Sequence, residues 1–362
     1  MTRSTVARAF LVRWRWYLCA AGAACTLLWT LYFLSLHRRP IIIPLPHTFS
    51  ADNTSDVPAY HPPPSGPPMD PAGNATLGFE AILALSPFTS WRTRGLQAAA
   101  RITGLEIQIP PQPPVRPEMI DAFAGLGPED ARHPNHGSAL AWVAHLDLIK
   151  HVVQSDMETA LIMEDDADWD LSIREQMVGV AEAVRQLTKT TESEGIPYGD
   201  AWDVLWLGLC AETWDDTFET VYIDDQTACP AHQYSGLAKG PVERLPPAQR
   251  VVFYSGAPIC SFAYALTREG AKKVLLDIGA GQDEAFDIAL MNGCRERNLT
   301  CISVLPELFH HYIPSQNLGS TSFVNGGEEG KNFEIEVEMG STENILESAR
   351  CRALWGENCI PH

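Results

Sequence analysis

The chain has 362 residues, of which 45% are hydrophobic and 20% charged, a composition typical of a globular protein with one large domain or two smaller ones. The formal net charge is -19, and because six arginines lie before residue 40, the remainder holds only 20 basic against 45 acidic residues. Such an acidic body argues against a nucleic acid as the partner, since a phosphate backbone needs a basic surface, but it is compatible with divalent cations that recruit phosphate.

The N-terminal region predicts a membrane anchor. Residues 16–36 contain no charged side chain, and about 20 apolar residues suffice to span a bilayer. Four arginines precede this run and two follow it, so the positive-inside rule places the N-terminus in the cytoplasm. A cleaved signal peptide is the alternative, because small residues at 21–24 offer a cleavage site. We expect a cytoplasmic tail (1–15), a transmembrane signal anchor (16–36) and a single-pass type II protein whose body lies in the lumen of the Golgi or endoplasmic reticulum.

A proline-rich stretch follows and predicts an extended stem at residues 37–75. Asn53, Asn74 and Asn298 each begin an Asn-x-Ser/Thr sequon, which agrees weakly with a lumenal body. The remaining residues, 76–362, are expected to form the functional domain.

Strand-like and helix-like segments alternate along this domain. Buried-type strands are predicted at 159–163, 204–207 and 259–266, a short apolar run lies at 79–85, and further strands are predicted at 105–109 and 301–305. Helices are predicted at 92–103, 138–154, 268–277 and 284–296. Ser138 is the expected N-cap of the second helix. This alternation predicts an α/β fold with a mixed, mainly parallel sheet flanked by helices.

Seven cysteines lie beyond the apolar N-terminal segment, and none forms a CxxC pair, which argues against a zinc knuckle. Cys294 with Cys301 and Cys351 with Cys359 are the nearest candidates for disulfides, and the odd number leaves at least one free thiol.

An acidic cluster is the chief anomaly of the sequence. The predicted strand at 159–163 runs directly into Glu164, Asp165 and Asp166, with Asp168 and Asp170 close behind. Ligands of open α/β sheets bind at the carboxyl ends of strands, and a divalent cation relieves the repulsion among crowded carboxylates. We therefore expect Asp166 and Glu164 to bind metal, Glu164 and Asp165 to face the sugar and ribose of a nucleotide-sugar, and the last two acids to be outer-shell or capping groups. The alternative is a solvated acidic turn at the start of a helix near residue 171.

The segment from Gly137 to Asp170, a helix followed by a strand and then Glu-Asp-Asp, resembles glycosyltransferase family 25, with its lipopolysaccharide and collagen galactosyltransferases and its fungal-type members. Gly137 and His145 match the glycine and the histidine of the family's helix, and the resemblance runs from about residue 77 to residue 311. Two features depart from the family. Ala144 stands where Ser is frequent, and Leu85 with Ser86 replaces a typical Asn-Leu.

This resemblance implies a GT-A-like fold, a nucleoside-diphosphate sugar donor, a divalent metal such as Mn²⁺ and inversion at the anomeric carbon. Arg92 and Arg94 resemble the family's Arg-x-x-Arg region and are candidates to bind the donor diphosphate. Because they are two residues apart on a helix, only one of them is expected to reach it.

Inverting transfer needs a base near the acceptor hydroxyl, and the loop at 279–287 offers Asp283, Glu284 and Asp287. Asp287 resembles an acid that many family members carry before a helix. The alternative for these acids is stabilisation of a helix N-terminus.

His310 and His311 follow an apolar run, and either of them could complete a metal shell, although packed loop histidines are the simpler interpretation. His145 is expected to be a satisfied core histidine, and Asp203 a strand-entry acid.

The sequence lacks a GxxxxGK[ST] loop, a GxGxxG fingerprint and a GxSxG elbow, which argues against P-loop ATPases, ordinary dinucleotide enzymes and α/β-hydrolases. We expect a metal-dependent inverting transfer of a hexose, galactose by family association, from a UDP-sugar to a glycan or glycoprotein. A catalytically inactive lumenal lectin-like or scaffold homologue is the main alternative, and a metal-dependent phosphohydrolase is a weaker one.

Overall fold

The computed structural model describes residues 70–191, 196–296, 298–315, 318, 324 and 334–359. All of them belong to one of the two units into which the chain divides, Tyr60–His362. The predicted cytoplasmic tail, the predicted membrane span and the predicted stem up to residue 69 lie outside the described residues. The described fold begins with a short 3-10 helix, η1 (Pro71–Gly73), ahead of the predicted domain start at residue 76.

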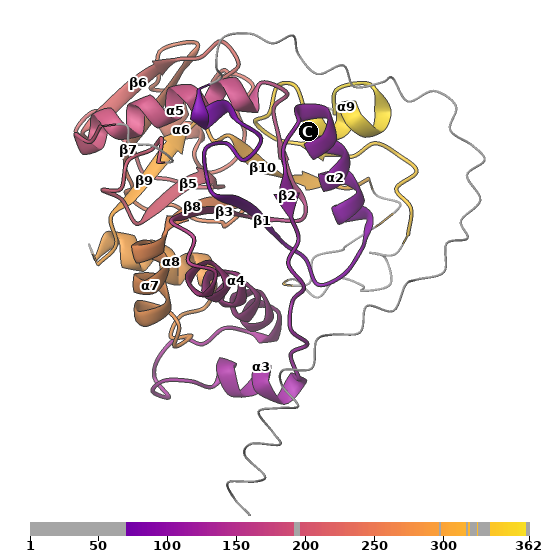
Figure 1. Cartoon of the computed structure of the whole chain (residues 1–362), viewed down its shortest axis with the longest axis vertical. Coiled ribbons are helices and arrows are strands. Elements are labelled where there is room, and N and C mark those ends of the chain that lie inside the picture. The colour runs from indigo at the N-terminus through magenta and orange to yellow at the C-terminus, as the bar shows by residue number, and fades with distance from the viewer. Residues whose placement is uncertain are drawn as a thin grey trace, which may run out of the picture. The chain divides into compact units, whose positions relative to one another are not determined.

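The core of the fold is a large mixed sheet, whose strands occupy the centre of Figure 1. Its order is β2-β1-β3-β8-β5-β9-β7-β6. The strands are β1 (Ala81–Leu85), β2 (Ile107–Gln108), β3 (Thr159–Glu164), β5 (Val204–Gly208), β6 (Thr220–Asp224), β7 (Gln249–Tyr254), β8 (Ala263–Thr267) and β9 (Cys301–Leu305). The β1–β2, β1–β3 and β5–β9 pairs are parallel, whereas the other four pairs are antiparallel.

Helices cover both faces of this sheet (Figure 1). One face carries α2 (Trp91–Thr103) and α5 (Ile173–Thr188), and the opposite face carries α4 (His136–Gln154), α7 (Arg268–Asp277) and α8 (Phe286–Arg295). Two smaller helices are α3 (Pro117–Ala124) and α6 (Lys239–Val242).

Alternation of side chains along the strands explains this arrangement. In β3, Leu161 and Met163 enter the core beneath α2 and α5, whereas Ala160 and Ile162 enter the core beneath α4 and α7. Because successive side chains of a strand point to opposite faces, a continuous apolar run fills both cores.

A second, smaller sheet adjoins the end of β3. Its order is β11-β10-β4, formed by β4 (Ala167–Trp169), β10 (Phe309–Ile313) and β11 (Ser341–Thr342). The last helix, α9 (Ala349–Trp355), packs against α2. The chain therefore passes from the large sheet to the small one through the two residues between β3 and β4.

Three disulfides cross-link the fold. Cys294–Cys301 and Cys351–Cys359 confirm the two nearest pairs expected from spacing, and Cys210–Cys260 joins segments 50 residues apart. Cys229 is free and buried, and burial raises the pKa of its thiol to about 12.

The predicted elements are largely confirmed, with informative differences. The helix expected from Ser138 begins at His136 and is capped by Asn135, whose side chain accepts a hydrogen bond from the Ser138 amide. The mixed sheet agrees with the expectation, but β8 inserts antiparallel between β3 and β5, so parallel pairs are not the majority.

The fold-class prediction of a transmembrane helix and the prediction of a single-pass Golgi or endoplasmic reticulum membrane protein are corrected. Within the part of the chain that the structure describes, no helix has the length and apolar character needed to cross a bilayer. The apolar run at 16–36, on which both predictions depended, lies outside that part.

Candidate functional site

The acidic cluster lies where two parallel strands end. Glu164 is the last residue of β3 and pairs in register with Leu85, the last residue of β1. Asp165 and Asp166 form the turn into β4. Carboxyl ends of neighbouring parallel strands are a usual location for ligands in α/β sheets.

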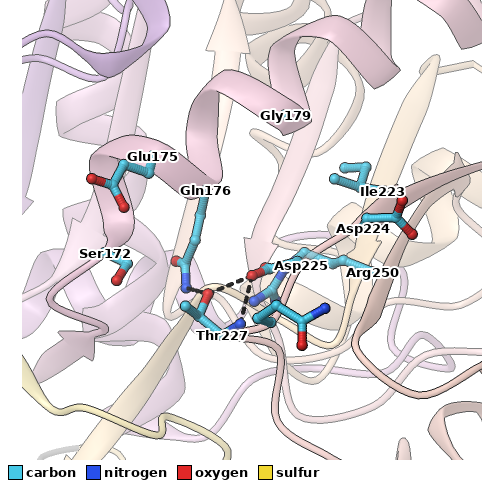
Figure 2. A pocket seen from close by; sticks show the side chains of 10 residues that line it. Ser172, Glu175, Gln176, Gly179, Ile223, Asp224, Asp225, Thr227 and Arg250 are labelled. Carbon is cyan, nitrogen blue, oxygen red and sulfur yellow. Dashed lines mark hydrogen bonds and ion pairs between the residues drawn. The ribbon is translucent and has the colours of Figure 1, made fainter.

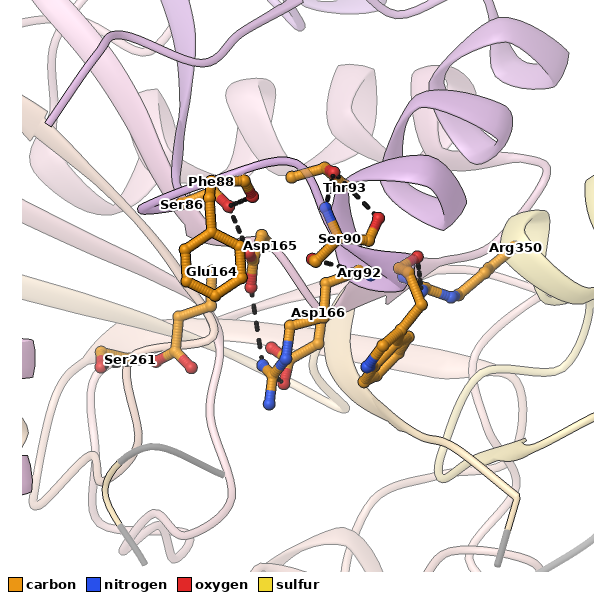
Figure 3. Close-up of polar contacts among 11 residues, drawn as sticks. Ser86, Phe88, Ser90, Arg92, Thr93, Glu164, Asp165, Asp166, Ser261 and Arg350 are labelled. Carbon is orange, nitrogen blue, oxygen red and sulfur yellow. Dashed lines mark hydrogen bonds and ion pairs between the residues drawn. The ribbon is translucent and has the colours of Figure 1, made fainter. Parts of the chain in front are cut away.

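Arg92 lies among these carboxylates. Its Nη1 forms an ion pair with Asp166 Oδ2 and lies 3.5 Å from Asp165 Oδ1 (Figure 3). The arginine is in the first turn of α2, which Ser90 caps by accepting a hydrogen bond from the Arg92 amide. The helix N-terminus and the guanidinium therefore both present positive charge to the cluster. Arg94 instead donates a hydrogen bond to the Glu334 carbonyl, so only Arg92 faces the cluster.

The cluster is tightly held. Asp165 is 7% exposed, and its Oδ2 accepts a 2.5 Å hydrogen bond from Ser86 in the loop after β1 (Figure 3). Burial raises the pKa of the Glu164 and Asp165 carboxyl groups, and the charge of Asp166 raises both further. Arg92 and the serine hydrogen bonds oppose these shifts. A bound cation would therefore stabilise the ionised forms of these three neighbouring carboxyl groups.

Asp168 and Asp170 have a structural role. Asp168 is fully buried and accepts hydrogen bonds from Ser348 Oγ and the Arg350 amide at the start of α9. Asp170 accepts from the amides of Ser172 and Glu347. Both carboxylates therefore tie the chain after β4 to the C-terminal helix, in agreement with capping rather than ligand binding.

The two histidines of β10 have different surroundings. His310 is 3% exposed, with its Nε2 3.8 Å from Glu307 Oε1 and its ring against Phe262. His311 pairs across the small sheet with Ala167, the residue after Asp166. Burial lowers the pKa of His311, and the charge of Asp166 opposes that shift. Of the two, His311 is the one placed beside the cluster.

The three candidate bases are dispersed. Asp283 accepts a 2.6 Å hydrogen bond from Asn292 Nδ2, and Glu284 is exposed with its Oε1 3.4 Å from Arg132. Asp287 lies in the first turn of α8, where its Oδ2 accepts from the Cys260 amide and its Oδ1 from the Ile288 amide. Among the described residues, no contact joins Asp283 or Glu284 to the cluster. Asp287 contacts Cys260, the residue directly before Ser261.

Ser261 is a site residue that the sequence did not reveal. Its Oγ donates a 2.9 Å hydrogen bond to Glu164 Oε1 (Figure 3) and lies 3.4 Å from His145 Nε2. The expectation that His145 is a satisfied core histidine is confirmed by its burial and by its contact with Tyr264. Ser261 lies in the loop before β8, and a lone serine gives no sequence signal of its own, because its partners lie 97 and 116 residues away. Asp203, in turn, is the expected structural acid, bound by Lys273 and by the Thr300 amide.

Asp166 and His311 each have one buried side-chain atom that could bind a metal ion. Oδ1 of Asp166 and Nδ1 of His311 are buried and accept or donate no hydrogen bond among the described residues. Carboxylate oxygen and imidazole nitrogen both suit Mn²⁺. No three His, Cys, Asp or Glu side chains of the described chain converge as a metal-binding group. Asp166 and His311 would therefore leave most positions around a bound cation to water and to substrate phosphates.

A separate cavity of about 200 Å³ lies between α5 and the β6–β7 pair (Figure 2). Arg250 lines it, but its charge is balanced by Asp225, whose Oδ2 accepts a 2.9 Å hydrogen bond from Arg250 Nε. The cavity shares no lining residue with the acidic cluster. We therefore assign it no part in the candidate site.

Neither the protein-family models nor the curated protein sequences match this chain. Among solved structures, the chain is similar to the inositol-1-phosphate CTP transferase from T. maritima, at 12% identity over 68% of this chain and 93% of that chain, with a TM-score of 0.28. So low a TM-score carries no argument about fold or reaction. Function must therefore be argued from the site residues.

Proposed function

We propose that the chain is an inverting, metal-dependent glycosyltransferase similar to family 25, which moves a hexose, galactose by the family resemblance, from a UDP-sugar to a hydroxyl of a glycan or glycoprotein. One observation carries the proposal. Three adjacent carboxylates are held at the carboxyl ends of β1 and β3, against the N-terminus of α2 and Arg92.

The residues divide the work as follows. Asp166 and His311 would hold a divalent cation, which when bound supplies Lewis-acid stabilisation of the leaving diphosphate. Arg92 would pair with phosphate oxygens, because a guanidinium fork matches them, and would leave the carboxylates as the cation takes its place. Glu164 and Asp165 would accept hydrogen bonds from sugar and ribose hydroxyls.

Asp287 is the proposed base for the acceptor hydroxyl. Of the three candidates, it alone is bonded to the segment that also contacts Glu164, through Cys260 and Ser261. Its two oxygens each accept one backbone hydrogen bond and retain further lone pairs.

The test compares UDP binding by the full-length protein with and without Mn²⁺, together with slow hydrolysis of UDP-galactose. We expect binding that depends on Mn²⁺, and a loss of tenfold or more in affinity for Asp166→Asn, since a charge-assisted contact contributes about 1.5–3 kcal/mol. Asp200→Asn, an exposed carboxylate, is the matched control and should bind like the wild type. Absence of UDP binding by the wild type in millimolar Mn²⁺ would overturn the proposal.

A non-catalytic, glycan-binding homologue is the second candidate. It is favoured by the ion pairs that Arg92 already forms with Asp165 and Asp166 and by the lack of a third convergent metal ligand among the described side chains. Such a protein would bind glycans with an affinity that neither UDP nor Mn²⁺ changes. Glycan binding measured with and without UDP therefore separates the two candidates.

A further inference from the structure

A buried chain of polar side chains leads from the core to Glu164. Tyr264 Oη lies 3.0 Å from His145 Nδ1, His145 Nε2 lies 3.4 Å from Ser261 Oγ, and Ser261 Oγ lies 2.9 Å from Glu164 Oε1. Tyr264, His145 and Ser261 are 0%, 2% and 8% exposed. Three polar groups are thus placed in an apolar core, where each must be satisfied by the next.

When Glu164 is ionised, the bonding pattern sets the direction of every hydrogen bond in this chain. Burial lowers the pKa of His145 to about 3, so its imidazole is neutral and has one donor and one acceptor nitrogen. Since Ser261 donates its hydroxyl hydrogen to Glu164, it accepts from Nε2–H of His145. Nδ1 then accepts from the Tyr264 hydroxyl, and burial raises the pKa of that hydroxyl and keeps it protonated. The Tyr264 hydroxyl, the Nε2–H of His145 and the Ser261 hydroxyl therefore each donate to the next group in the direction of the Glu164 carboxylate.

The surrounding structure holds this chain rigidly. The ring of Phe286 stacks on His145 with centroids 4.4 Å apart and planes 3° apart. Tyr264 lies in β8, opposite Ile162 of β3. Cys260, which precedes Ser261, has a positive φ of 70° and is held by its disulfide to Cys210 and by the Asp287 carboxylate. Such support is what a preorganised site needs in order to keep one oxygen in place.

From this geometry we infer that Ser261 and His145 are positioning residues: they fix one oxygen of Glu164 and so orient its carboxylate toward the hydroxyls of a bound nucleotide-sugar. The inference rests on the proposed function for the identity of the ligand. The orientation of Glu164 itself does not depend on any ligand, so it can be tested separately.

The ligand-free test uses crystal structures of the full-length wild type and of Ser261→Ala. Without the hydroxyl, Glu164 should turn away from its present position, whereas Ser261→Thr, which keeps the hydroxyl, should leave it in place. A ¹⁵N spectrum of the wild type should show the hydrogen of His145 on Nε2. An unchanged Glu164 in Ser261→Ala, or a hydrogen on Nδ1, overturns the inference even if no nucleotide binds.

The ligand-dependent test measures UDP affinity in Mn²⁺ by calorimetry, with the melting temperature as a readout of folding. We expect Ser261→Ala to weaken binding about tenfold, as for loss of a hydrogen bond to a charged group, with little change in melting temperature. Ser261→Thr should bind within about twofold of the wild type, and Tyr264→Phe should have a smaller effect because it removes only the most distant donor.

The outcomes distinguish the two ideas. If both variants of Ser261 lose affinity and melting temperature together, the serine is merely structural and the inference fails. If the wild type does not bind UDP while Glu164 still turns in Ser261→Ala, the proposed function fails and the positioning role remains.

Discussion

At the scale of single residues, Arg92 and the carboxylates determine each other's charge. The arginine side chain is 11% exposed, and those of Asp165 and Asp166 are 9% and 13% exposed, so water screens this group only weakly. Removing one partner of a buried ion pair leaves an uncompensated charge, which costs more than the pair itself contributes. Arg92 is thus the counter-charge that the described structure gives to Asp165 and Asp166.

Replacing Arg92 by Met should lower the free energy of unfolding by about 3 kcal/mol in the absence of divalent cations, because two buried carboxylates lose their counter-charge. Added Mn²⁺ should restore part of this loss, since a ligand that binds only the folded state stabilises it. Denaturant unfolding with and without Mn²⁺ measures both effects.

Arg94→Met is the matched control, because this arginine is exposed, donates a hydrogen bond to the Glu334 carbonyl and interacts with Glu336, and has no contact with the cluster among the described residues. Its stability should stay within about 0.5 kcal/mol of the wild type. If Arg92→Met were as stable as the wild type without metal, the guanidinium would not be the counter-charge of the cluster.

At the scale of elements, the first turn of α7 packs so closely against the backbone before β5 that no side chain fits between them. Gly270 in the first turn of α7 donates its amide to Thr267, and a Cβ there would lie 2.1 Å from the Asp203 carbonyl oxygen. That backbone enters β5 and cannot retreat without moving the central sheet.

Gly270→Ala should therefore destabilise the protein by about 2–3 kcal/mol, although alanine is intrinsically the better helix former. Gly240→Ala in α6 is the control, since nothing lies within 4 Å of its Cβ position. That change should be neutral or stabilising by up to about 1 kcal/mol. Chemical unfolding of both variants checks the contrast, and equal effects would contradict the steric explanation.

The long apolar strands and the amphipathic helices of the large sheet were predictable from the sequence, because apolar periodicity and length are local properties, whereas β6, β7 and the short strands of the small sheet were not predicted. The directions of the strands were not. A buried strand such as β8 has the same continuous apolar pattern whether its neighbours are parallel or antiparallel. The sequence also favoured Ser138 as a cap over Asn135, three residues earlier, since both residue types cap helices well.

The candidate site was predictable only in part, for a similar reason. The acidic cluster is contiguous in sequence and visible at once, and its place after a strand follows from the apolar run before it. The contacts that define its chemistry join Arg92 to Asp166 and Ser86 to Asp165 across 74 and 79 residues. Only the folded chain shows that His311, and not His310, lies beside the cluster.

At the scale of the whole molecule, stability depends on several buried carboxyl groups. Glu212 is 6% exposed and accepts hydrogen bonds from the amides of Thr213 and Ala257 and from Ser303 Oγ. Burial raises its pKa from 4.5 to about 7. A group with a raised pKa in the folded state stabilises that state fully below pH 4.5, and this stabilisation is lost as the pH rises through 7.

Glu212→Gln should abolish this contribution, because the amide oxygen still accepts the two backbone hydrogen bonds and the amide NH2 can donate to Ser303 Oγ, which then donates to Ser255, but the group cannot ionise. The stability of the variant relative to the wild type should therefore increase between about pH 4.5 and 7, by on the order of 3 kcal/mol, since one pKa unit corresponds to about 1.4 kcal/mol. Urea unfolding across this range measures the change. Glu269→Gln on the surface should run parallel to the wild type, and a parallel curve for Glu212→Gln would refute the assignment.

The covalent cross-links have a practical consequence for producing the protein. Three disulfides form only under oxidising conditions, and one of them, Cys210–Cys260, joins residues 50 positions apart and fixes the residue directly before Ser261. In recombinant material from a reducing bacterial cytosol the Cys210–Cys260 disulfide would therefore be missing, and a failure of that material to bind UDP would not test the proposed function. Export to the periplasm or a secreting host avoids this, and the buried, poorly ionised thiol of Cys229 is a weak competitor for correct pairing.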